Sequence, residues 1–270
     1  MVVFPNAKIN LGLSVTEKRA DGFHNIETVF YPVPLRDALE LTVAPDGKTE
    51  FGFSGMTIPG AVQRNLCFKA WNLLKKDFNL PEIKFHLHKV IPMGAGLGGG
   101  SADGAFTIRI LNQVFDLGLS AEQMQDYARR LGSDCAFFIQ NKPVFAFEKG
   151  DHFDSINLDL SGFFLILIKP AINVNTALAY ANIVPYRPSL PVKEIINLPV
   201  EKWKELLKND FETSVFKSYP EIGTIKKQLY ESGALYASMS GSGSAVFGIF
   251  KTKTEMKSHF PDFFYWSGEL

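Results

Sequence analysis

The sequence has few of the features that mark secreted, membrane or disulfide-rich proteins. Its 270 residues include only two cysteines, Cys67 and Cys135, which lie too far apart for a Cys-x-x-Cys metal site and are too few for a disulfide framework. No apolar run approaches the roughly 20 residues that span a bilayer, and the first residues carry no basic segment typical of a signal peptide. We therefore expect a cytoplasmic protein without membrane attachment or metal–thiolate chemistry.

An excess of charge is lacking as well. The 28 Lys and Arg residues balance 28 Asp and Glu residues, which gives a formal net charge of zero. Because nucleic-acid-binding proteins carry a basic surplus, we expect no nucleic-acid partner and instead a small molecule. The composition, 46% hydrophobic and 21% charged, is ordinary for a globular protein, and the length allows one large or two modest domains.

Glycine is concentrated in one stretch, residues 92–102, with the sequence PMGAGLGGGSA. Five of the seven residues from Gly94 to Gly100 are glycine, so the backbone can adopt positive φ and its N–H groups can converge on an anion. Apolar residues at helical spacing follow, with Ser101 or Asp103 as the expected N-cap. The positive end of that helix favours the same negative ligand, so the pattern predicts a phosphate-binding loop.

Other phosphate-binding patterns fit less well. Gly94, Gly96 and Gly99 satisfy G-x-G-x-x-G, but the dinucleotide fingerprint requires a further strand closed by an acidic residue. Here Asp116 directly follows the helical run and leads to another helix start at Ser120. The loop lacks the lysine of a nucleotide P-loop, and the sequence contains neither His-Arg-Asp nor Asp-Phe-Gly. A purely structural glycine-rich turn is the other interpretation.

Apolar and other residues alternate from Ala7 to Val15, which predicts a half-buried strand. Lys8 and Asn10 share one face of this strand. They are candidates for a site, although a solvated strand face would show the same pattern.

A turn through Asp21 and Gly22 follows, and it presents Phe23 and His24 side by side. The phenyl ring can stack on a planar group, and the imidazole can donate or accept hydrogen bonds. A turn that happens to contain a histidine is the alternative.

Further elements are expected in the first half of the chain. Residues 39–43 and 50–53 read as strands, and the Pro-Asp-Gly sequence between them predicts a hairpin. Asn65 is placed to cap a helix whose apolar residues share one face.

Residues 83–89 alternate as a half-buried strand with His86 and His88 on its exposed face. These two histidines could bind a metal ion, or they could simply be solvated. Lys89 ends this strand, and we expect its charge at the mouth of the glycine loop.

Ser120 opens a second helix with a capping box, and a turn containing Asp134 follows it. A carboxylate at such a position is either a structural helix-start residue or a catalytic group. Cys135 beside it is expected to be a small buried hydrophobic residue.

The second half of the chain predicts a strand at residues 163–168 that is buried on both faces. A strand, a small-residue turn at 240–243 and a second strand close the chain, and the turn is either a plain hairpin or another group of N–H donors. Helices are expected at 175–182, 200–207, 209–218 and 220–231. The boundary lies between 150 and 163, which gives domains 1–155 and 156–270.

Five stretches, residues 5–11, 19–24, 92–102, 131–134 and 240–243, together carry a resemblance to the GHMP kinases, which include galactokinase and the homoserine, mevalonate and phosphomevalonate kinases. The resemblance implies an α+β fold of two domains with the active site in the cleft between them. It also implies ATP with Mg²⁺ as phosphoryl donor, and a CDP-linked methylerythritol of the non-mevalonate isoprenoid pathway as substrate, phosphorylated on its 2-hydroxyl.

The resemblance also assigns roles to residues by position. It implies that Lys8 and Asp134 form the catalytic pair and that Asn65 and Lys89 lie near the adenosine. It implies no protein residue as a metal ligand. The residues implied to bind the substrate are Asn10, Phe23 and His24. The implied ATP-phosphate loop consists of Pro92, Met93, Gly94, Ala95, Gly96, Leu97, Gly98, Gly99, Gly100, Ser101 and Ala102.

Two departures from the family pattern and two alternative functions accompany this interpretation. Phe23 stands where the family usually has tyrosine, and Cys135-Ala136 replaces the common Val-Pro after Asp134. The chain could phosphorylate another small alcohol, of the homoserine or mevalonate type, or bind nucleotide without turnover. A monomer or a weak homodimer is expected.

Overall fold

The computed structural model describes residues 1–181 and 183–270. These residues divide into two compact units, which we describe separately. Unit 1 contains residues 1–7, 35–93 and 98–142, and unit 2 contains residues 8–34, 94–97 and 143–270. Each unit is made of three separate segments of the chain, so the units do not correspond to one N-terminal and one C-terminal block. The domain boundary near residue 155 stays a prediction.

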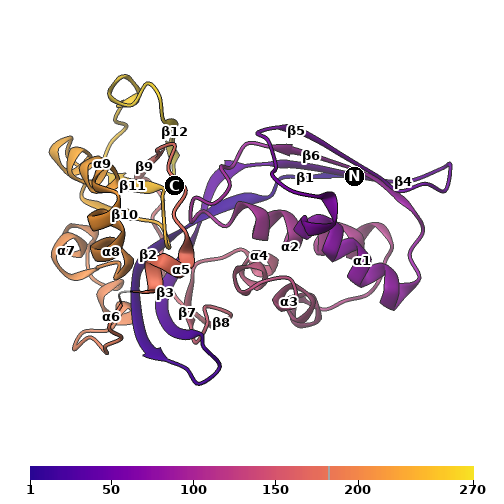
Figure 1. Ribbon diagram of the computed structural model, residues 1–270, viewed down its shortest axis with the longest axis horizontal. Helices are drawn as coiled ribbons and strands as arrows, with labels where there is room; N and C mark the ends of the chain where they lie inside the picture. Colours follow the sequence, from indigo (N-terminus) through magenta and orange to yellow (C-terminus); the bar gives the residue numbers. More distant parts are fainter. Residues whose placement is uncertain (182) are drawn as a thin grey trace. The chain divides into compact units, whose positions relative to one another are not determined.

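Unit 1 is built on a four-stranded sheet with the order β1-β4-β6-β5 (Figure 1). β4 runs antiparallel to β6, and β5 runs parallel to it, so the hairpin predicted between β4 and β5 is wrong. Phe51 of β5 lies in register with Phe85 and packs against Trp71, and this long-range packing decides the pairing. The strands are β1 (Val2–Val3), β4 (Ala38–Val43), β5 (Glu50–Gly55) and β6 (Ile83–Lys89).

Helices cover one face of this sheet (Figure 1). Two predicted caps are confirmed: the Asn65 side chain accepts a hydrogen bond from the Cys67 N–H, and Ser120 forms a capping box with Gln123. The helices are α1 (Leu66–Phe78), α2 (Gly99–Val114), α3 (Ala121–Arg129) and α4 (Phe137–Gln140), with short 3₁₀ helices at Val62–Arg64 and Ser133–Ala136.

Unit 2 contains most of a sheet with the order β2-β3-β7-β8. The strand predicted at residues 7–15 is confirmed, but it is buried on both faces instead of one. Leu13 and Val15 enter a hydrophobic cluster with Phe211, while the polar side chains of the other face are enclosed and bonded to one another. The strands are β2 (Asn6–Lys18), β3 (His24–Arg36), β7 (Val144–Phe147) and β8 (His152–Ser155).

A second, antiparallel sheet of unit 2 has the order β10-β11-β9-β12, and its strand β9 is buried on both faces as predicted. The predicted helices of this half are present, although Asn182 lies outside the described residues. No helix in the described chain is long and apolar enough to cross a membrane. The elements are α5 (Thr176–Ala181), α6 (Val192–Ile195), α7 (Val200–Leu206), α8 (Phe211–Ser218), α9 (Pro220–Glu231), a 3₁₀ helix (Lys257–His259), β9 (Phe164–Lys169), β10 (Tyr236–Met239), β11 (Val246–Phe250) and β12 (Phe264–Glu269).

Candidate active site

The glycine-rich loop has the backbone that its sequence predicts. Gly94, Gly96 and Gly98 have φ values of 62°, 76° and 69°, in the left-handed region that glycine tolerates best. Gly98 is the N-cap of α2, so the prediction that Ser101 or Asp103 caps this helix is wrong. Since no side chain caps the helix, its first-turn N–H groups are available to an anion, as a phosphate loop requires.

The glycines of the loop serve two purposes. A Cβ atom at Gly96 would lie 1.9 Å from the backbone oxygen of Ser240, and one at Gly99 would lie 2.8 Å from the Ile91 side chain, so both positions need glycine for packing within the protein. A Cβ atom at Gly100 would meet no atom within 4 Å. Gly100 therefore leaves open space beside the loop.

Lys8 lies on β2 in unit 2 and is enclosed by polar and aromatic neighbours. Its side chain, 3% exposed, places Nζ 2.5 Å from Oδ1 of Asn10 and 4.7 Å from the centre of the Phe30 ring. The interpretation of Lys8 and Asn10 as a solvated strand face is therefore wrong. Burial of an ammonium group costs free energy unless the group has polar partners. The hydrogen bond from Lys8 to Asn10 offsets part of this cost.

Two hydroxyl groups hold Asn10 in place. The backbone N–H of Asn10 donates to Oγ of Ser240 (3.2 Å), and the Ser240 hydroxyl donates to the Gly96 carbonyl (2.8 Å). The Asn10 amide donates to Oγ1 of Thr28 (3.1 Å), whose own hydroxyl donates to the Gly12 carbonyl (2.5 Å). The turn at residues 240–243 is thus bonded to the glycine loop and to β2 and is more than a plain hairpin.

Sequence reasoning missed Thr28. This threonine is fully buried on β3, and its hydroxyl is the partner of the Asn10 amide. A threonine between apolar residues of a strand is common enough that its position alone indicates no role.

Asp134 belongs to unit 1, where it lies in the 3₁₀ helix Ser133–Ala136 and is partly exposed. Cys135 beside it is fully buried, as predicted, and burial raises the pKa of its thiol to about 12. Lys8 belongs to unit 2. The approach of Asp134 to Lys8 stays a prediction.

Lys89 lies beside the loop, because a Cβ atom at Gly99 would be 3.0 Å from its Nζ atom, but its charge does not face an open mouth of the loop as we expected. Its side chain is completely buried, and Nζ lies 2.5 Å from Asp37 and 2.7 Å from Asp103. Lys89 occupies one of the inward-facing positions of β6, so the alternation of the strand predicts its burial. Its two acidic partners come from distant segments, and no local pattern indicates them.

A cavity of about 470 Å³ lies beside this ion cluster within unit 1. Asn65, Met93, Gly100 and Asp103 line it together with residues 53–62, which comprise the end of β5 and the chain that follows it. A cavity of this size and a mostly apolar lining suit a nucleoside-sized ligand. Asn65, one of the two residues predicted near adenosine, thus borders the same cavity as Met93 and Gly100 of the loop, whereas Lys89 is not among the residues that line it.

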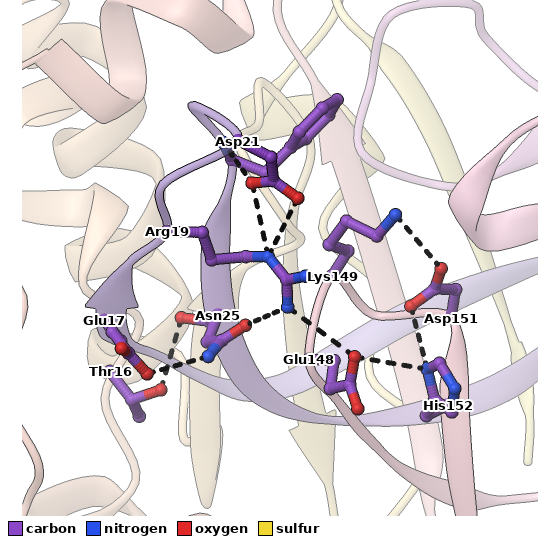
Figure 2. A network of polar contacts seen from close by, with 10 residues as sticks. Thr16, Glu17, Arg19, Asp21, Asn25, Glu148, Lys149, Asp151 and His152 are labelled. Carbon is purple, nitrogen blue, oxygen red and sulfur yellow. Dashed lines mark hydrogen bonds and ion pairs between the residues drawn. The ribbon is translucent and has the colours of Figure 1, made fainter.

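The turn between β2 and β3 is held by Arg19 (Figure 2). Its guanidinium group contacts Asp21 (3.1 Å), Asn25 (2.9 Å) and Glu148 (3.6 Å). The turn therefore has a fixed shape, which a side chain used for recognition requires.

The two candidate recognition residues on this turn differ in their surroundings. Phe23 is 58% exposed, whereas His24 stacks on Tyr180 with ring centres 4.7 Å apart. Partial burial, aided by the charge of Lys18, lowers the pKa of His24 and favours its neutral form. Tyr180 was not selected from the sequence, since a tyrosine in a helical stretch is usually a core residue.

The two histidines on β6 are exposed as predicted, and both contact the Ser54 hydroxyl, at 2.8 and 3.0 Å. Among the residues that the structure describes, no group of three or more His, Cys, Asp or Glu side chains could hold a metal ion.

Comparison with known proteins shows similarity along the whole chain. The family models for the GHMP kinase N-terminal and C-terminal domains match residues 65–142 and 192–259. A 4-diphosphocytidyl-2-C-methyl-D-erythritol kinase of Bacteroides fragilis is 53% identical over 95% of this chain and 94% of its own length. The protein of the same name from Parabacteroides distasonis is 50% identical over the full length of both chains.

Solved structures agree with these sequence matches. A crystal structure of 4-(cytidine 5'-diphospho)-2C-methyl-D-erythritol kinase matches with a TM-score of 0.83 and 28% identity, and covers 99% of this chain and 98% of the other. The mevalonate kinase of Methanococcus jannaschii shares the fold, with a TM-score of 0.72 at 14% identity over 99% and 97% of the two chains.

Proposed function

The chain belongs to the GHMP kinases, in the family of 4-diphosphocytidyl-2-C-methyl-D-erythritol kinases, and from this premise we propose its reaction. It transfers the γ-phosphoryl group of ATP to the 2-hydroxyl of 4-diphosphocytidyl-2-C-methyl-D-erythritol. The observation that carries the proposal is full-length identity of about half to relatives of that name. Those names favour this substrate over homoserine or mevalonate.

The proposed nucleotide site combines the glycine loop with the cavity of unit 1. Adenosine fills the cavity lined by Asn65 and Met93, and the phosphates approach the N–H groups of the loop and of the first turn of α2. The open space at Gly100 supports this orientation. A Mg²⁺ ion bound with ATP would neutralise part of the negative charge of the triphosphate.

The proposed substrate side lies in unit 2. The exposed Phe23 ring offers a stacking surface for the cytosine base, and neutral His24 has one donor and one acceptor nitrogen for its polar edge. The stack on Tyr180 fixes the plane of the imidazole. Asn10, held by Ser240 and Thr28, is the proposed contact to the sugar-alcohol part.

Lys8 and Asp134 are the proposed catalytic residues. The substrate oxygen forms a bond to the γ-phosphorus while the bond from that phosphorus to the bridging β,γ-oxygen breaks, and ADP leaves. Asp134 accepts the hydroxyl proton, and Lys8 offsets the negative charge on the phosphoryl group in the transition state. Asn10 orients the Lys8 ammonium through its Oδ1 atom.

The remaining proposals concern the state of the protein in the cell. We propose a cytoplasmic monomer or weak homodimer that binds neither nucleic acid nor membranes. Analytical ultracentrifugation measures the association, and a stable higher oligomer would contradict it.

A substrate panel tests the proposed reaction. ADP release is measured with the CDP-linked methylerythritol, with methylerythritol phosphate lacking the cytidylyl group, with homoserine and with mevalonate. Base stacking contributes about 1–3 kcal/mol, so kcat/KM for the CDP-linked compound should exceed that for the truncated one by roughly 5- to 150-fold. Equal values for the two methylerythritol compounds, or faster turnover of homoserine or mevalonate, would contradict the proposal.

A further inference from the structure

The glycine loop contributes no positive charge of its own to a triphosphate. Residues 92–102 include neither lysine nor arginine, and the charge of the neighbouring Lys89 is taken up by Asp37 and Asp103 in the buried cluster. Proteins that bind nucleoside triphosphates place cationic side chains beside the phosphates. Such side chains must therefore come from other segments of this chain, as Lys8 does in the proposed function.

Loop residues 95–97 direct their carbonyl groups into unit 2, to which they belong. No backbone carbonyl group of the described chain accepts a hydrogen bond from the N–H groups of residues 94–97. Because Gly94 and Gly96 have positive φ, these N–H groups can form a concave site for an anion. The carbonyl groups of Ala95, Gly96 and Leu97 accept hydrogen bonds from the Ala245 N–H (3.1 Å), the Ser240 hydroxyl (2.8 Å) and the Lys8 N–H (2.9 Å).

Lys169, the last residue of β9, lies close to the first glycine of this segment. Its Nζ atom is 3.4 Å from Oδ1 of Asn173, and the same oxygen is 3.8 Å from the position that a Cβ atom would take at Gly94. All three residues belong to unit 2. Gly94 and Asn173 are exposed and Lys169 is half-buried, so a ligand at the loop can reach each of them.

The charge of Lys169 is not balanced by a carboxylate. Among residues 1–181 and 183–270, no Asp or Glu forms an ion pair with it, and burial alone lowers the pKa of its ammonium group. Lys226 of the same unit differs, because its Nζ atom lies 2.5 Å from Glu212. An ammonium group has three N–H donors, and Asn173 occupies one of them at a long distance. The other two donors can bind an anion.

We propose that Lys169 is a phosphate-binding residue: its ammonium group forms an ion pair with an oxygen of the phosphate chain of ATP, beside the N–H groups of residues 94–96. This inference rests on the proposed function, since it concerns the same nucleotide. Asn173 is a positioning residue whose Oδ1 atom holds the ammonium group near the loop. Segment 94–97 then has a lysine beside each end, Lys169 at Gly94 and Lys8 at Leu97.

Four substitutions separate a phosphate contact from a structural role. Lys169→Met removes the charge and keeps the length of the side chain, whereas Lys169→Arg keeps the charge. Asn173→Asp places a carboxylate beside Nζ and so neutralises Lys169 without replacing it. Lys251→Met is the matched control: Lys251 is an exposed lysine that follows β11 at the opposite end of the same sheet, where Phe250 pairs with Phe164.

Calorimetric titration at pH 7.5 with ATP, with adenosine and with cytidine diphosphate measures three affinities for each protein. We expect Lys169→Met and Asn173→Asp to bind ATP roughly tenfold more weakly than the wild type, as loss of one charge-assisted hydrogen bond predicts. Both should keep the wild-type affinity for adenosine, which has no phosphate, and for cytidine diphosphate. Lys169→Arg should retain most of the ATP affinity, and Lys251→Met should retain all of it.

Three results would overturn the inference. Unchanged ATP affinity of Lys169→Met would show that the ammonium group does not touch the phosphates. Equal losses for ATP and adenosine would show a structural role, and a loss for cytidine diphosphate instead of ATP would assign the cation to the diphosphate of the alcohol substrate. The comparison of Lys169→Arg with Asn173→Asp decides the matter even if Lys169→Met does not fold.

Failure of the proposed function gives a different result. In that case the wild type itself does not bind ATP, which contradicts both proposals. Wild-type ATP binding that none of these substitutions changes contradicts only the role of Lys169.

Discussion

Single side chains carry the proposed chemistry, and Asp134 is the most directly testable of them. Asp134→Asn keeps the shape of the side chain but cannot accept the hydroxyl proton, so kcat should fall by roughly 100-fold or more while the KM for ATP stays unchanged. Steady-state kinetics and thermal unfolding measure both effects. Asp126→Asn is the control, because Asp126 is an exposed acid of α3 that pairs with Arg129 of the same helix. Near-wild-type turnover of Asp134→Asn would remove Asp134 from the mechanism.

Lys8 allows a second test at this scale. Lys8→Met retains the length of the side chain but removes the charge, and kcat should fall by roughly 100- to 1,000-fold because the transition-state charge is no longer offset. Lys253→Met changes an exposed lysine of the same unit and should leave turnover unchanged. Similar kinetics for the two variants would exclude Lys8 from the site.

We expect both cysteines to be unreactive toward alkylating reagents in the folded protein. Burial raises the pKa of Cys135 to about 12 and holds that of Cys67 well above its usual value, so very little thiolate exists at pH 8. Iodoacetamide at pH 8 should label almost none of the native protein and both cysteines after unfolding in urea, as counted by mass spectrometry. Rapid labelling of the native protein would show that one thiol is accessible.

At the scale of elements, alanine substitutions at Gly100 and Gly96 of the glycine loop should have opposite effects on the stability of the fold. Gly100→Ala adds a methyl group in open space within a helix, so it should stabilise the fold by about 0.5–1 kcal/mol. The same methyl group would stand between the backbone and the phosphates and should weaken ATP binding at least tenfold. Denaturant unfolding and calorimetry measure the two effects. Unchanged ATP affinity would show that Gly100 does not face the nucleotide.

Gly96→Ala is the contrasting change in the same loop. Its Cβ atom would overlap the Ser240 carbonyl, and its φ of 76° disfavours any side chain, so the variant should be destabilised by more than about 2 kcal/mol. A midpoint of denaturant unfolding equal to that of the wild type would contradict the packing seen at this residue.

Elements whose pattern is local were predictable from the sequence. The caps of α1 and α3, the alternation of β6 and the fully apolar strand β9 all depend on neighbours within a few residues. The pairing of β5 was not predictable, because a turn at Pro45 to Gly47 fits a hairpin equally well. Phe51 decides the pairing by packing on Phe85 and Trp71, which are far away in the chain.

The candidate site shows the same limit. The glycine loop was found because its residue types and spacing are unusual, whereas Lys8 and Asn10 stayed open as a solvated strand face until the resemblance to the GHMP kinases implied roles for them. The partners that fix them, such as Thr28 and Ser240, and the acids around Lys89 are ordinary residues until the chain folds. Which polar residues form the site therefore depends on burial and on contacts between residues far apart in the chain. Neither can be predicted from a single sequence.

At the scale of the whole molecule, the two proposed ligands should protect different parts of the chain. The proposed adenosine cavity and the start of α2, at residues 53–66 and 98–103, lie in unit 1, whereas the proposed recognition turn at residues 19–25 and helix α5 lie in unit 2. Each ligand at about 100 times its Kd stabilises the folded chain by about 2.7 kcal/mol, which slows the opening reactions that expose amides.

Hydrogen exchange followed by mass spectrometry measures this protection segment by segment. ATP alone should slow exchange at residues 53–66 and 98–103, and the CDP-linked alcohol alone should slow it at residues 19–25 and 176–181. Cytidine diphosphate without the alcohol should protect the same turn more weakly, because the base contacts remain and the alcohol contacts are lost. If the cytidine compounds protected residues 53–66 instead, the base would occupy the cavity beside Asp103, and the assignment of the two ligands to the two units would be reversed.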